Sequence, residues 1–561
     1  MYRLIIILLI LVTLSCKETN TTNQTTAEVE NKTSQVNEKP FIWEGANLYF
    51  LLTDRFNNGD TSNDVNFDRT RETGKLRGFK GGDIKGITQK VKEGYFSDLG
   101  INAIWMTPIV EQIHGGTDEG TGVSYGFHGY WAKDWTSIDP NFGTKEDLHE
   151  LVKEAHARGI RIVLDAVINH TGPVTEKDPV WPDEWVRTDK QCTYDTYENT
   201  VSCTLVANLP DIRTESNDNV DLPPQLVEKW KAEGRYEQEV AELDAFFKRT
   251  GYPRAPRFYI MKWLTDYITE FGVDGYRADT VKHTEAYVWQ EFKTECDYAF
   301  AEYKKNNPDK ILDNNDFYLV GEVYNYNISS GQLFDFGDKK VNYFDPASFH
   351  SLINFEFKWN SKELDYQPLF KKYSDILHGD LKDFGTLNYL SSHDDGSPFD
   401  ANRTKPFETA NKLLLSPGTS QVYYGDESAR RLVVKGANGD ANLRSLMNWD
   451  SIAKNTRTKE VLSHWQKLGT FRERHPSIGA GMHQMITQEP YVFYRSFSKA
   501  DYKDLVVVGL NLENGKKTIS VSRVFEDGTV LHDAYSKQDV KVENGKVVLE
   551  SPYNMVLLEK K

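Results

Sequence analysis

The 561-residue sequence predicts an α/β protein built on a (β/α)₈ TIM barrel, with an inserted domain after the third strand and a C-terminal antiparallel β domain. From Asn47 to about Glu427, short β-rich runs alternate with amphipathic stretches, which is the pattern of βαβ units around a parallel sheet. Polar residues cluster where the β-rich runs end, as in barrels whose active site lies at the carboxyl ends of the strands. No Gly-rich phosphate loop follows the first run, which disfavours the alternative of a doubly wound sheet.

Seven predicted strands are clear, and residues 353–357 (INFEF) are a plausible eighth. The clear strands read NLYFLLTDRF, INAIWMTPI, IRIVLDAVINH, FGVDGYRAD, FYLVGEVYN, TLNYLSSHD and TSQVYYGDE. Between them lie stretches such as DLHELVKEAHARG and KWLTDYITEFG, whose apolar period of 3.6 residues predicts helices.

The spacing of the strands predicts the domain boundaries. About one hundred residues separate the third and fourth strands, far more than an ordinary βα loop contains. We therefore expect the barrel at 41–170 and 257–460, and an inserted domain at 171–256 whose later half is helical. Short strands follow residue 476, with Asn514-Gly515 and Asn544-Gly545 as hairpin turns, and predict a C-terminal β-sandwich at 470–561.

The first forty residues are typical of an export signal and a tether. Arg3 precedes an eleven-residue apolar run, Leu4 to Leu14, that is too short to span a bilayer. Ser15-Cys16 then resembles the end of a bacterial lipoprotein signal. Residues 1–16 thus predict an exported outer-membrane lipoprotein, on the periplasmic or cell-surface side, anchored through a lipid on Cys16; a plain secretory signal is the alternative. Residues 17–40 are polar and predict a disordered tether.

Composition narrows the choice of partner. A net charge of −16 argues against nucleic acid, because a phosphate backbone requires a basic face. The 12% of aromatic residues suits a partner with flat, weakly polar faces, such as a sugar ring. Export would permit a disulfide between Cys192 and Cys203, whereas Cys296 lies in a helical pattern and is expected to be a buried free thiol.

The segment GYRADTVKH (275–283) gathers several ionisable residues at the end of an apolar run. Asp279 follows Arg277 by two positions on a strand, so both side chains point to one side and the guanidinium keeps the carboxylate ionised. An ionised aspartate is a nucleophile for glycosyl transfer, which also needs a protonated carboxyl for the leaving oxygen. Glu322 ends an apolar run that would raise its pKa, and Asp394 could stabilise a cationic transition state.

Four segments resemble, in order and spacing, the hallmark regions of glycoside hydrolase family 13, the α-amylase family. They are DAVINH (165–170), GYRADTVKH (275–283), GEVYN (321–325) and LSSHD (390–394). GINAIWMTP (100–108), FHGYW (127–131), NLPDI (208–212) and GTSQVYYGDE (418–427) match as well. The resemblance covers roughly residues 41–561, with the insertion as domain B and the C-terminal domain as domain C. It looks most like the periplasmic α-amylases of Gram-negative bacteria.

The resemblance implies Asp279 as nucleophile, Glu322 as general acid/base, Asp394 as stabiliser of the transition state and Arg277 as partner of the nucleophile. Ser392 replaces the family's usual asparagine, which helps hold chloride in chloride-activated members, so we expect no chloride activation. Substrate contacts are implied for His128, Tyr130, Trp131, His170 and His393 around the sugar before the cut, and for Lys282 and His283 on the leaving-group side.

The resemblance also implies Ca²⁺ as a cofactor. Asn169 and Asp211, with the backbone carbonyl of His283, match ligands that tie domain B to the barrel, and oxygen donors suit Ca²⁺. Residues 54–68 and a later GGD resemble the N-terminal calcium loop of cyclodextrin glucanotransferases, although they lack the glutamate of an EF-hand; an Asn/Asp-rich turn without metal is the alternative. The implied ligands of this loop are Asn58, Asp60, Asn63, Asp64, Gly81 and Asp83.

We therefore expect an exported, monomeric α-amylase that cleaves internal α-1,4 bonds of starch, glycogen and maltooligosaccharides with retention of configuration. One alternative is a transglycosylase on the same site, in which a sugar hydroxyl replaces water. Another is a non-catalytic glucan-binding protein, which the presence of all three carboxylates disfavours.

Overall fold

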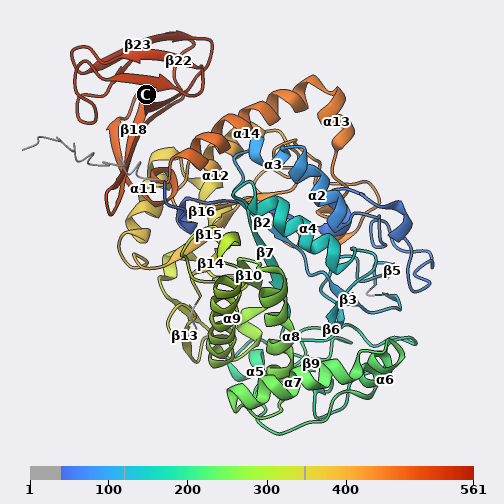
Figure 1. Cartoon of the computed structure of the whole chain (residues 1–561). Helices are drawn as coiled ribbons and strands as arrows, with labels where there is room; N and C mark the ends of the chain where they lie inside the picture. Colours follow the sequence, from blue (N-terminus) through green and yellow to red (C-terminus); the bar gives the residue numbers. More distant parts are fainter. Residues whose placement is uncertain (1–38, 119, 347–348) are drawn as a thin grey trace, which may run out of the picture. The chain divides into compact units, whose positions relative to one another are not determined.

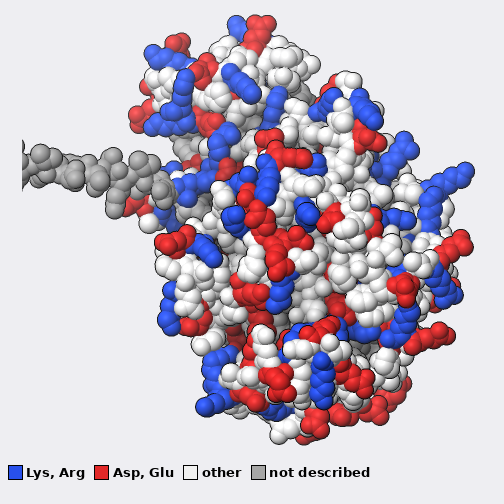
Figure 2. Space-filling model, turned by 45° about the vertical axis from the view of Figure 1, so that its right-hand side comes forward, with Lys and Arg blue, Asp and Glu red and all other residues white. Residues whose placement is uncertain are grey.

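The computed structural model describes residues 39–118, 120–346 and 349–561 (Figure 1). The predicted signal at 1–16, with Cys16, and nearly all of the predicted tether lie outside the described residues. Within the described part of the chain, no helix combines the length and apolar character needed to cross a membrane. Acidic and basic side chains are interspersed over the face seen in Figure 2.

Eight parallel strands form a closed barrel, as predicted. All of their residues are buried, as expected for parallel strands that are covered on both faces. Around the barrel the strands are β1 (Asn47–Leu51), β2 (Ala103–Met106), β7 (Arg161–Ala166), β10 (Gly275–Ala278), β11 (Tyr318–Gly321), β14 (Ser351–Asn354), β15 (Gly385–Tyr389) and β16 (Thr419–Tyr423), which pairs with β1.

The barrel strands end earlier than the runs that predicted them, and the sixth and first strands show why. The sixth, β14, spans Ser351–Asn354 and not 353–357, because helix α10 begins at Phe357. The first, β1, stops at Leu51, and Thr53–Phe56 forms the helical turn α1. In both places the buried apolar run continues past the last strand residue, so hydrophobicity alone does not mark the end of the strand.

Helices connect successive strands and surround the barrel (Figure 1). Helix α8 ends at Gly272, whose φ of 73° is left-handed and whose Cβ, if present, would lie 2.0 Å from Cζ of Tyr303, so only glycine fits there. The barrel helices are α2 (Ile84–Lys92), α3 (Tyr95–Asp98), α4 (Lys145–His156), α8 (Pro256–Phe271), α9 (Ala286–Asn306), α10 (Phe357–Glu363), α11 (Tyr366–Leu377), α12 (Pro406–Leu414), α13 (Trp449–Lys454), α14 (Thr456–Arg474) and α15 (Ser477–Ala480).

The insertion between β7 and β10 packs against barrel helix α8. The Trp263 ring of α8 lies 6.2 Å from the Trp185 ring and 6.1 Å from the Trp230 ring. Ion pairs also join the insertion to β6 (Ala132–Ile138), since Lys229 and Arg235 both pair with the buried Asp134 carboxylate of that strand. The elements of the insertion are β8 (Val186–Arg187), α5 (Glu198–Val201), β9 (Asp211–Ile212), α6 (Pro224–Ala232) and α7 (Tyr236–Thr250).

Three short hairpins lie in the loops that follow barrel strands. They pair β3 (Val110–Gln112) with β6 (Ala132–Ile138), β4 (Thr117–Asp118) with β5 (Val123–Ser124), and β12 (Leu333–Asp335) with β13 (Lys340–Asn342).

The C-terminal region is antiparallel, as predicted, and its first strand begins at Met482; residue 470 lies inside α14. Asn544-Gly545 makes a tight turn, with φ of 51° and 69° and a bridge between Glu543 and Lys546. The predicted hairpin at Asn514-Gly515 is wrong, because β20 pairs with the distant β23. The strands are β17 (Met482–Thr487), β18 (Tyr491–Lys499), β19 (Tyr502–Leu510), β20 (Gly515–Ser520), β21 (Val530–Asp533), β22 (Gln538–Lys541), β23 (Lys546–Ser551) and β24 (Val556–Lys560).

Candidate active site

A cleft of about 620 Å³ opens at the carboxyl ends of the barrel strands. Its lining comes from segments that are far apart in the sequence, and it includes all of the predicted catalytic and substrate-binding residues except Arg277. These residues are His128, Tyr130, Trp131, His170, Asp279, Lys282, His283, Glu322, His393 and Asp394.

Arg277 is fully buried and its guanidinium joins three carboxylates. Nη1 lies 2.6 Å from Asp279 Oδ1 and 3.0 Å from Asp165 Oδ1, and Nη2 lies 3.0 Å from Glu322 Oε2. The register of the barrel produces this arrangement, because Arg277 stands opposite Asp165 on β7 while Ala278 stands opposite Gly321 on β11. A buried guanidinium is tolerated when its fork is paired in this way.

Glu322 is held in a state that suits a proton donor. Burial raises the pKa of Glu322 to about 8; Arg277 opposes the rise, and the charges of Asp279 and Asp394 add to it. Oε2 faces Arg277 and also accepts the backbone N–H of Thr280 at 3.0 Å. Thr280 adopts a left-handed φ of 48°, which is rare for a β-branched residue. Because both donors approach Oε2, the proton of the neutral carboxyl belongs on Oε1.

Asp394 lies at the opening of the cleft, with its side chain 33% exposed. Partial burial works against its ionisation, but His393, Arg277 and Ser392 outweigh it and hold the pKa of Asp394 below its ordinary value. The Ser392 hydroxyl donates to Asp394 Oδ1 at 2.9 Å. At neutral pH the cleft therefore contains a protonated carboxyl, Glu322, and an ionised one, Asp394, with the Arg277 guanidinium beneath them.

Aromatic residues of the FHGYW segment form one wall. The Tyr130 hydroxyl donates to Asp165 Oδ2 at 2.9 Å, and its ring stacks on the His393 ring at 5.3 Å. His170 Nε2 donates to the Tyr130 carbonyl at 3.1 Å, which leaves its buried Nδ1 without a hydrogen-bond partner among the described residues. Burial lowers the pKa of His170 and takes that of His393 to about 4, so both rings are neutral and can bond sugar hydroxyls.

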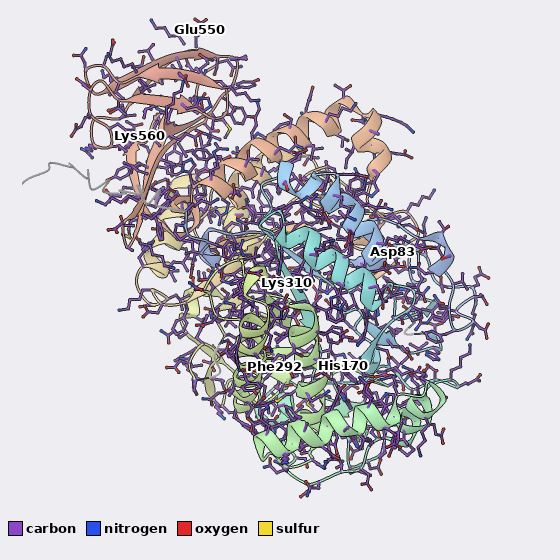
Figure 3. All side chains as sticks on the ribbon, in the orientation of Figure 1. Asp83, His170, Phe292, Lys310, Glu550 and Lys560 are labelled. Atoms are coloured by element: carbon purple, nitrogen blue, oxygen red, sulfur yellow. A yellow bond between two sulfur atoms is a disulfide. The ribbon has the colours of Figure 1, made fainter. Side chains whose placement is uncertain are left out.

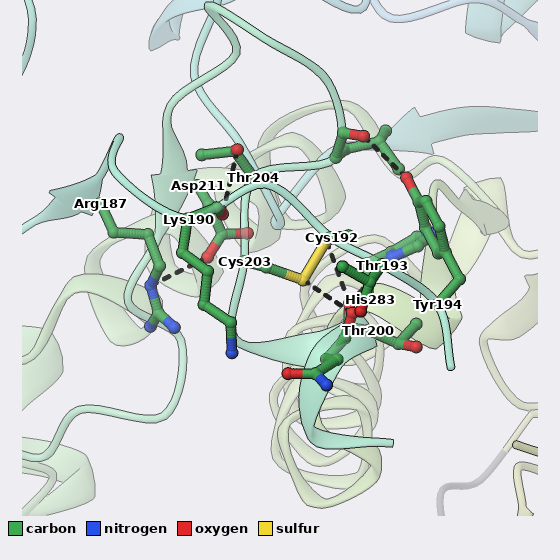
Figure 4. Close-up of a disulfide and its surroundings, with 12 residues drawn as sticks. Arg187, Lys190, Cys192, Thr193, Tyr194, Thr200, Cys203, Thr204, Asp211 and His283 are labelled. Carbon is green, nitrogen blue, oxygen red and sulfur yellow. Dashed lines mark hydrogen bonds and ion pairs between the residues drawn. A yellow bond between two sulfur atoms is a disulfide. The ribbon is translucent and has the colours of Figure 1, made fainter. Parts of the chain in front are cut away.

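Lys282 and His283 also line the cleft. Lys282 Nζ lies 5.3 Å from the centre of the Tyr324 ring, and burial lowers its pKa. His283 Nδ1 lies 3.0 Å from the Thr200 carbonyl, in the inserted segment that the Cys192–Cys203 disulfide closes (Figure 4). The predicted buried free thiol at Cys296 is also present.

Several lining residues were missed by the sequence reasoning. Four of them, Leu209, Thr280, Tyr324 and Asn325, stand in the quoted family segments and could have been found there, whereas the others lie in connecting segments, where neither period nor strand ends give a signal. Asp165, beneath the cleft, is among the polar residues expected at strand ends, but it was assigned no role. Arg444 Nε donates to the His393 carbonyl at 2.9 Å, and Asp440 joins Arg444 to Arg77. The other missed lining residues are Tyr194, Leu205, Val206, Leu209, Thr280, Tyr324 and Asn325.

The Asp211 carboxylate fits a hard cation; of the Asn169 amide, Nδ2 is the atom without a partner among the described residues, and Oδ1 accepts from Thr284 Oγ1 at 3.4 Å. Both carboxylate oxygens of Asp211 are buried without a hydrogen-bond donor among the described residues, with Arg187 Nε 3.1 Å from Oδ2 as an ion-pair partner (Figure 4). Burial raises the pKa of Asp211 well above its ordinary value. A buried carboxylate lacking donors is costly unless a cation neutralises it. The described residues hold no cluster of three or more His, Cys, Asp or Glu side chains suited to a metal, so amide and carbonyl oxygens would have to take part.

The six residues of the N-terminal loop also come together. Asn58 Nδ2 donates to Asp64 Oδ1 at 2.8 Å, and Gly81 lies so close that a Cβ would be 2.4 Å from each of those atoms. Asn63 Oδ1 is buried without a partner in the described chain. Asp60 pairs with Lys85, and Asp83 accepts three backbone N–H groups, so these two carboxylates already have protein partners. Asp83 belongs to the N-terminal loop, and His170 directly follows Asn169 of the other candidate calcium site. Figure 3 shows these two residues well separated, so the two candidate calcium sites are distinct.

Comparison with known proteins identifies related chains. The family model described as "Alpha amylase, catalytic domain" matches residues 50–477. The chain is 34% identical over 533 residues to the periplasmic alpha-amylase of Escherichia coli (strain K12), covering 83% of this chain and 72% of that protein. It is 26% identical over 523 residues to a cyclomaltodextrin glucanotransferase of Geobacillus stearothermophilus, covering 90% of this chain and 64% of that protein. An Anoxybacillus alpha-amylase structure superposes with a TM-score of 0.61 at 23% identity, over 93% of this chain and 99% of that one.

Proposed function

The chain belongs to glycoside hydrolase family 13, the α-amylase family, and from this premise we propose that it hydrolyses internal α-1,4-glucosidic bonds of starch, glycogen and maltooligosaccharides with retention of configuration. The proposal rests on one observation, the Arg277 fork that touches both Asp279 and Glu322. Retaining enzymes hold their two carboxyls roughly 5–5.5 Å apart, a spacing that one guanidinium can bridge.

In the proposed reaction, Asp279 attacks the anomeric carbon while Glu322 gives its proton to the leaving oxygen. The glucosidic bond breaks as a glycosyl ester forms on Asp279, and Glu322 is left as a carboxylate. Glu322 then takes a proton from water, whose oxygen displaces Asp279 and restores both carboxyls. Asp394 stabilises the positive charge that develops on the sugar in both steps.

Transfer to a sugar hydroxyl is the second candidate, because several relatives of 24–28% identity are cyclomaltodextrin glucanotransferases. The two reactions share every step up to the glycosyl ester and differ in the acceptor. Chromatography of the products from maltoheptaose separates them, since hydrolysis gives only chains shorter than seven units and transfer also gives longer or cyclic ones. Release of the α-anomer would support retention, and release of the β-anomer would contradict it.

Lys282 is proposed to bind the leaving part of the chain. With Lys282→Ala we expect kcat/KM on maltoheptaose to fall by roughly tenfold, the value of one hydrogen bond to a charged group, and to fall less on shorter chains. Amylose should be cleaved faster than pullulan or isomaltose. Lys310→Ala, at an exposed lysine of the short 3-10 helix Pro308–Lys310 between α9 and β11, is the matched control. Equal losses at every chain length would contradict the assignment, and isomaltose cleaved faster than maltoheptaose would contradict the linkage preference.

Calcium is proposed as a structural cofactor at Asn169, Asp211 and the His283 carbonyl, and at the N-terminal loop. An ion that binds only the folded chain stabilises it by mass action, so exhaustive chelation should lower Tm by roughly 5 °C, reversibly. Metal analysis of Asp211→Asn and of Asp64→Asn should each show one calcium fewer than the parent. An unchanged Tm after chelation, with no calcium found in the untreated protein, would rule out both sites.

We also propose export, with a lipid anchor on Cys16 and a monomeric state. Similarity to a periplasmic alpha-amylase supports export. The sequence motif ending at Cys16 supports the anchor, although Cys16 lies outside the described residues.

A further inference from the structure

We propose that the disulfide-closed loop 192–203 is a positioning device for His283, so that the Cys192–Cys203 bond sets the affinity of the cleft for the leaving part of the glucan. The inference rests on the proposed function. It concerns residues that lie outside the reacting groups and that act through His283.

The loop is short and covalently closed. Cys192 and Cys203 are eleven residues apart in sequence, with Cα atoms 5.0 Å apart. Between them lies the single helical turn α5, and the carbonyl of Thr200 in that turn points at His283 Nδ1 from 3.0 Å (Figure 4). Thr200 and His283 are 2% and 4% exposed, so water does not replace this contact readily.

This contact determines which ring nitrogen of His283 serves the cleft. A carbonyl oxygen only accepts, so Nδ1 must carry the hydrogen, and in a neutral ring Nε2 is then the acceptor. His283 lines the cleft. The loop therefore presents Nε2 of His283 as an acceptor for a sugar hydroxyl. If Thr200 were displaced, the His283 ring could rotate and either ring nitrogen could carry the hydrogen.

The same loop places a second side chain at the cleft. Tyr194 is 47% exposed, and its ring meets that of His283 edge-on at 5.6 Å. Its φ of 62° is left-handed, a conformation that a residue with a side chain keeps only where its surroundings impose it. Its hydroxyl donates to the Leu205 carbonyl at 2.7 Å, just beyond the disulfide. Opening the Cys192–Cys203 bond would thus free both ring systems together.

Other contacts would keep the opened loop folded. The Tyr197 ring packs 5.1 Å from the Phe336 ring, and Tyr197 N donates to Asp338 Oδ1 at 2.8 Å, both partners lying at the turn between β12 and β13. No residue of this loop is a buried member of the main hydrophobic core, although Tyr197 packs against that core. We therefore expect a variant without the disulfide to fold, with a Tm lowered by a few degrees.

The test compares two substrates in the double variant Cys192→Ser/Cys203→Ser, with Cys296→Ala as the matched control at the free cysteine. Maltoheptaose places sugars beyond the cut, whereas α-maltosyl fluoride places none there. We expect kcat/KM on maltoheptaose to fall about tenfold, mainly through KM, and kcat/KM on the fluoride to stay within twofold. All assays use saturating Ca²⁺, and calcium content is measured for every variant.

A double-mutant cycle with His283→Asn tests whether the disulfide affects kcat/KM through His283. If the disulfide acts through His283, its removal in the His283→Asn background should cost less than twofold on maltoheptaose. Equal losses on both substrates, fully additive losses, a loss of bound calcium that accounts for the change, or no loss on maltoheptaose would each overturn the inference. Failure of the proposed function is distinguishable, because a non-catalytic protein would turn over neither substrate, and a transglycosylase would turn over both but give longer or cyclic products from maltoheptaose.

Discussion

Replacement of Asp279 by asparagine is expected to abolish turnover, with a loss in kcat of on the order of 10⁴-fold or more. The amide has nearly the shape of the carboxylate and its oxygen still accepts from Arg277 Nη1, so the cleft should keep its form. It cannot, however, form the glycosyl ester on which the proposed reaction depends. The measurement is kcat/KM on maltoheptaose together with Kd for the same chain by calorimetry, which should change by less than tenfold.

The matched control is Asp274→Asn. Asp274 precedes β10, the strand whose other end leads to Asp279, and its carboxylate bonds His156 and the backbone N–H of Ile162. At the amino end of a barrel strand, such a change should lower stability and leave activity nearly intact. Activity of Asp279→Asn within tenfold of the parent would contradict its assignment as nucleophile.

Replacement of Glu322 by glutamine is expected to lower kcat on starch by roughly 10²–10⁴-fold, the usual contribution of a general acid. Fluoride leaves without a proton, so α-maltosyl fluoride should still form the glycosyl ester at close to the parent rate. A burst of fluoride release followed by slow turnover would be the signature, because the variant also lacks the base for the second step.

The Glu322 pKa of about 8 predicts how the activity depends on pH. Glu322 must be protonated to act as the acid, so kcat/KM on starch should be at its plateau below that pKa and fall as pH rises through about 8. For α-maltosyl fluoride, ester formation should lack this alkaline decline. Equal losses on starch and fluoride in Glu322→Gln, or an alkaline decline common to both substrates, would show that Glu322 is not the acid.

The barrel could be predicted from the sequence because short β-rich runs alternate with amphipathic stretches of helical period, and this alternation is visible without knowledge of which strands pair. Strand pairing in the C-terminal region was not visible in the same way. Asn514-Gly515 has the residues of a hairpin turn, yet β20 pairs with β23, some thirty residues later. Turn chemistry is local, whereas the partner of a strand is chosen by the packing of the whole sheet.

In the candidate site, too, some contacts could be predicted from the sequence and others could not. The contact between Arg277 on β10 and Asp279 just past its end follows from their spacing of two residues, and the nearness of Glu322 follows from its place just past the end of the next strand. The contact of Arg277 with Asp165 depends on the register between β7 and β10, which no local pattern encodes. Tyr194 reaches the cleft from a loop that a disulfide closes, and no local pattern in the sequence indicates the path of that loop.

Closure of the barrel between β1 and β16 has a consequence for how the chain folds. Asn47 and Ser420, which meet across this seam, are 373 residues apart. At a synthesis rate of roughly 5–20 residues per second, about 20–75 s pass between the emergence of the two strands from the ribosome. During that interval β1 exposes an edge with no partner, the kind of edge that nucleates aggregation. Because pairing across so long a stretch of chain is slow, we expect closure of this seam, and not helix formation, to limit the folding rate, and a chaperone to have most effect before β16 appears.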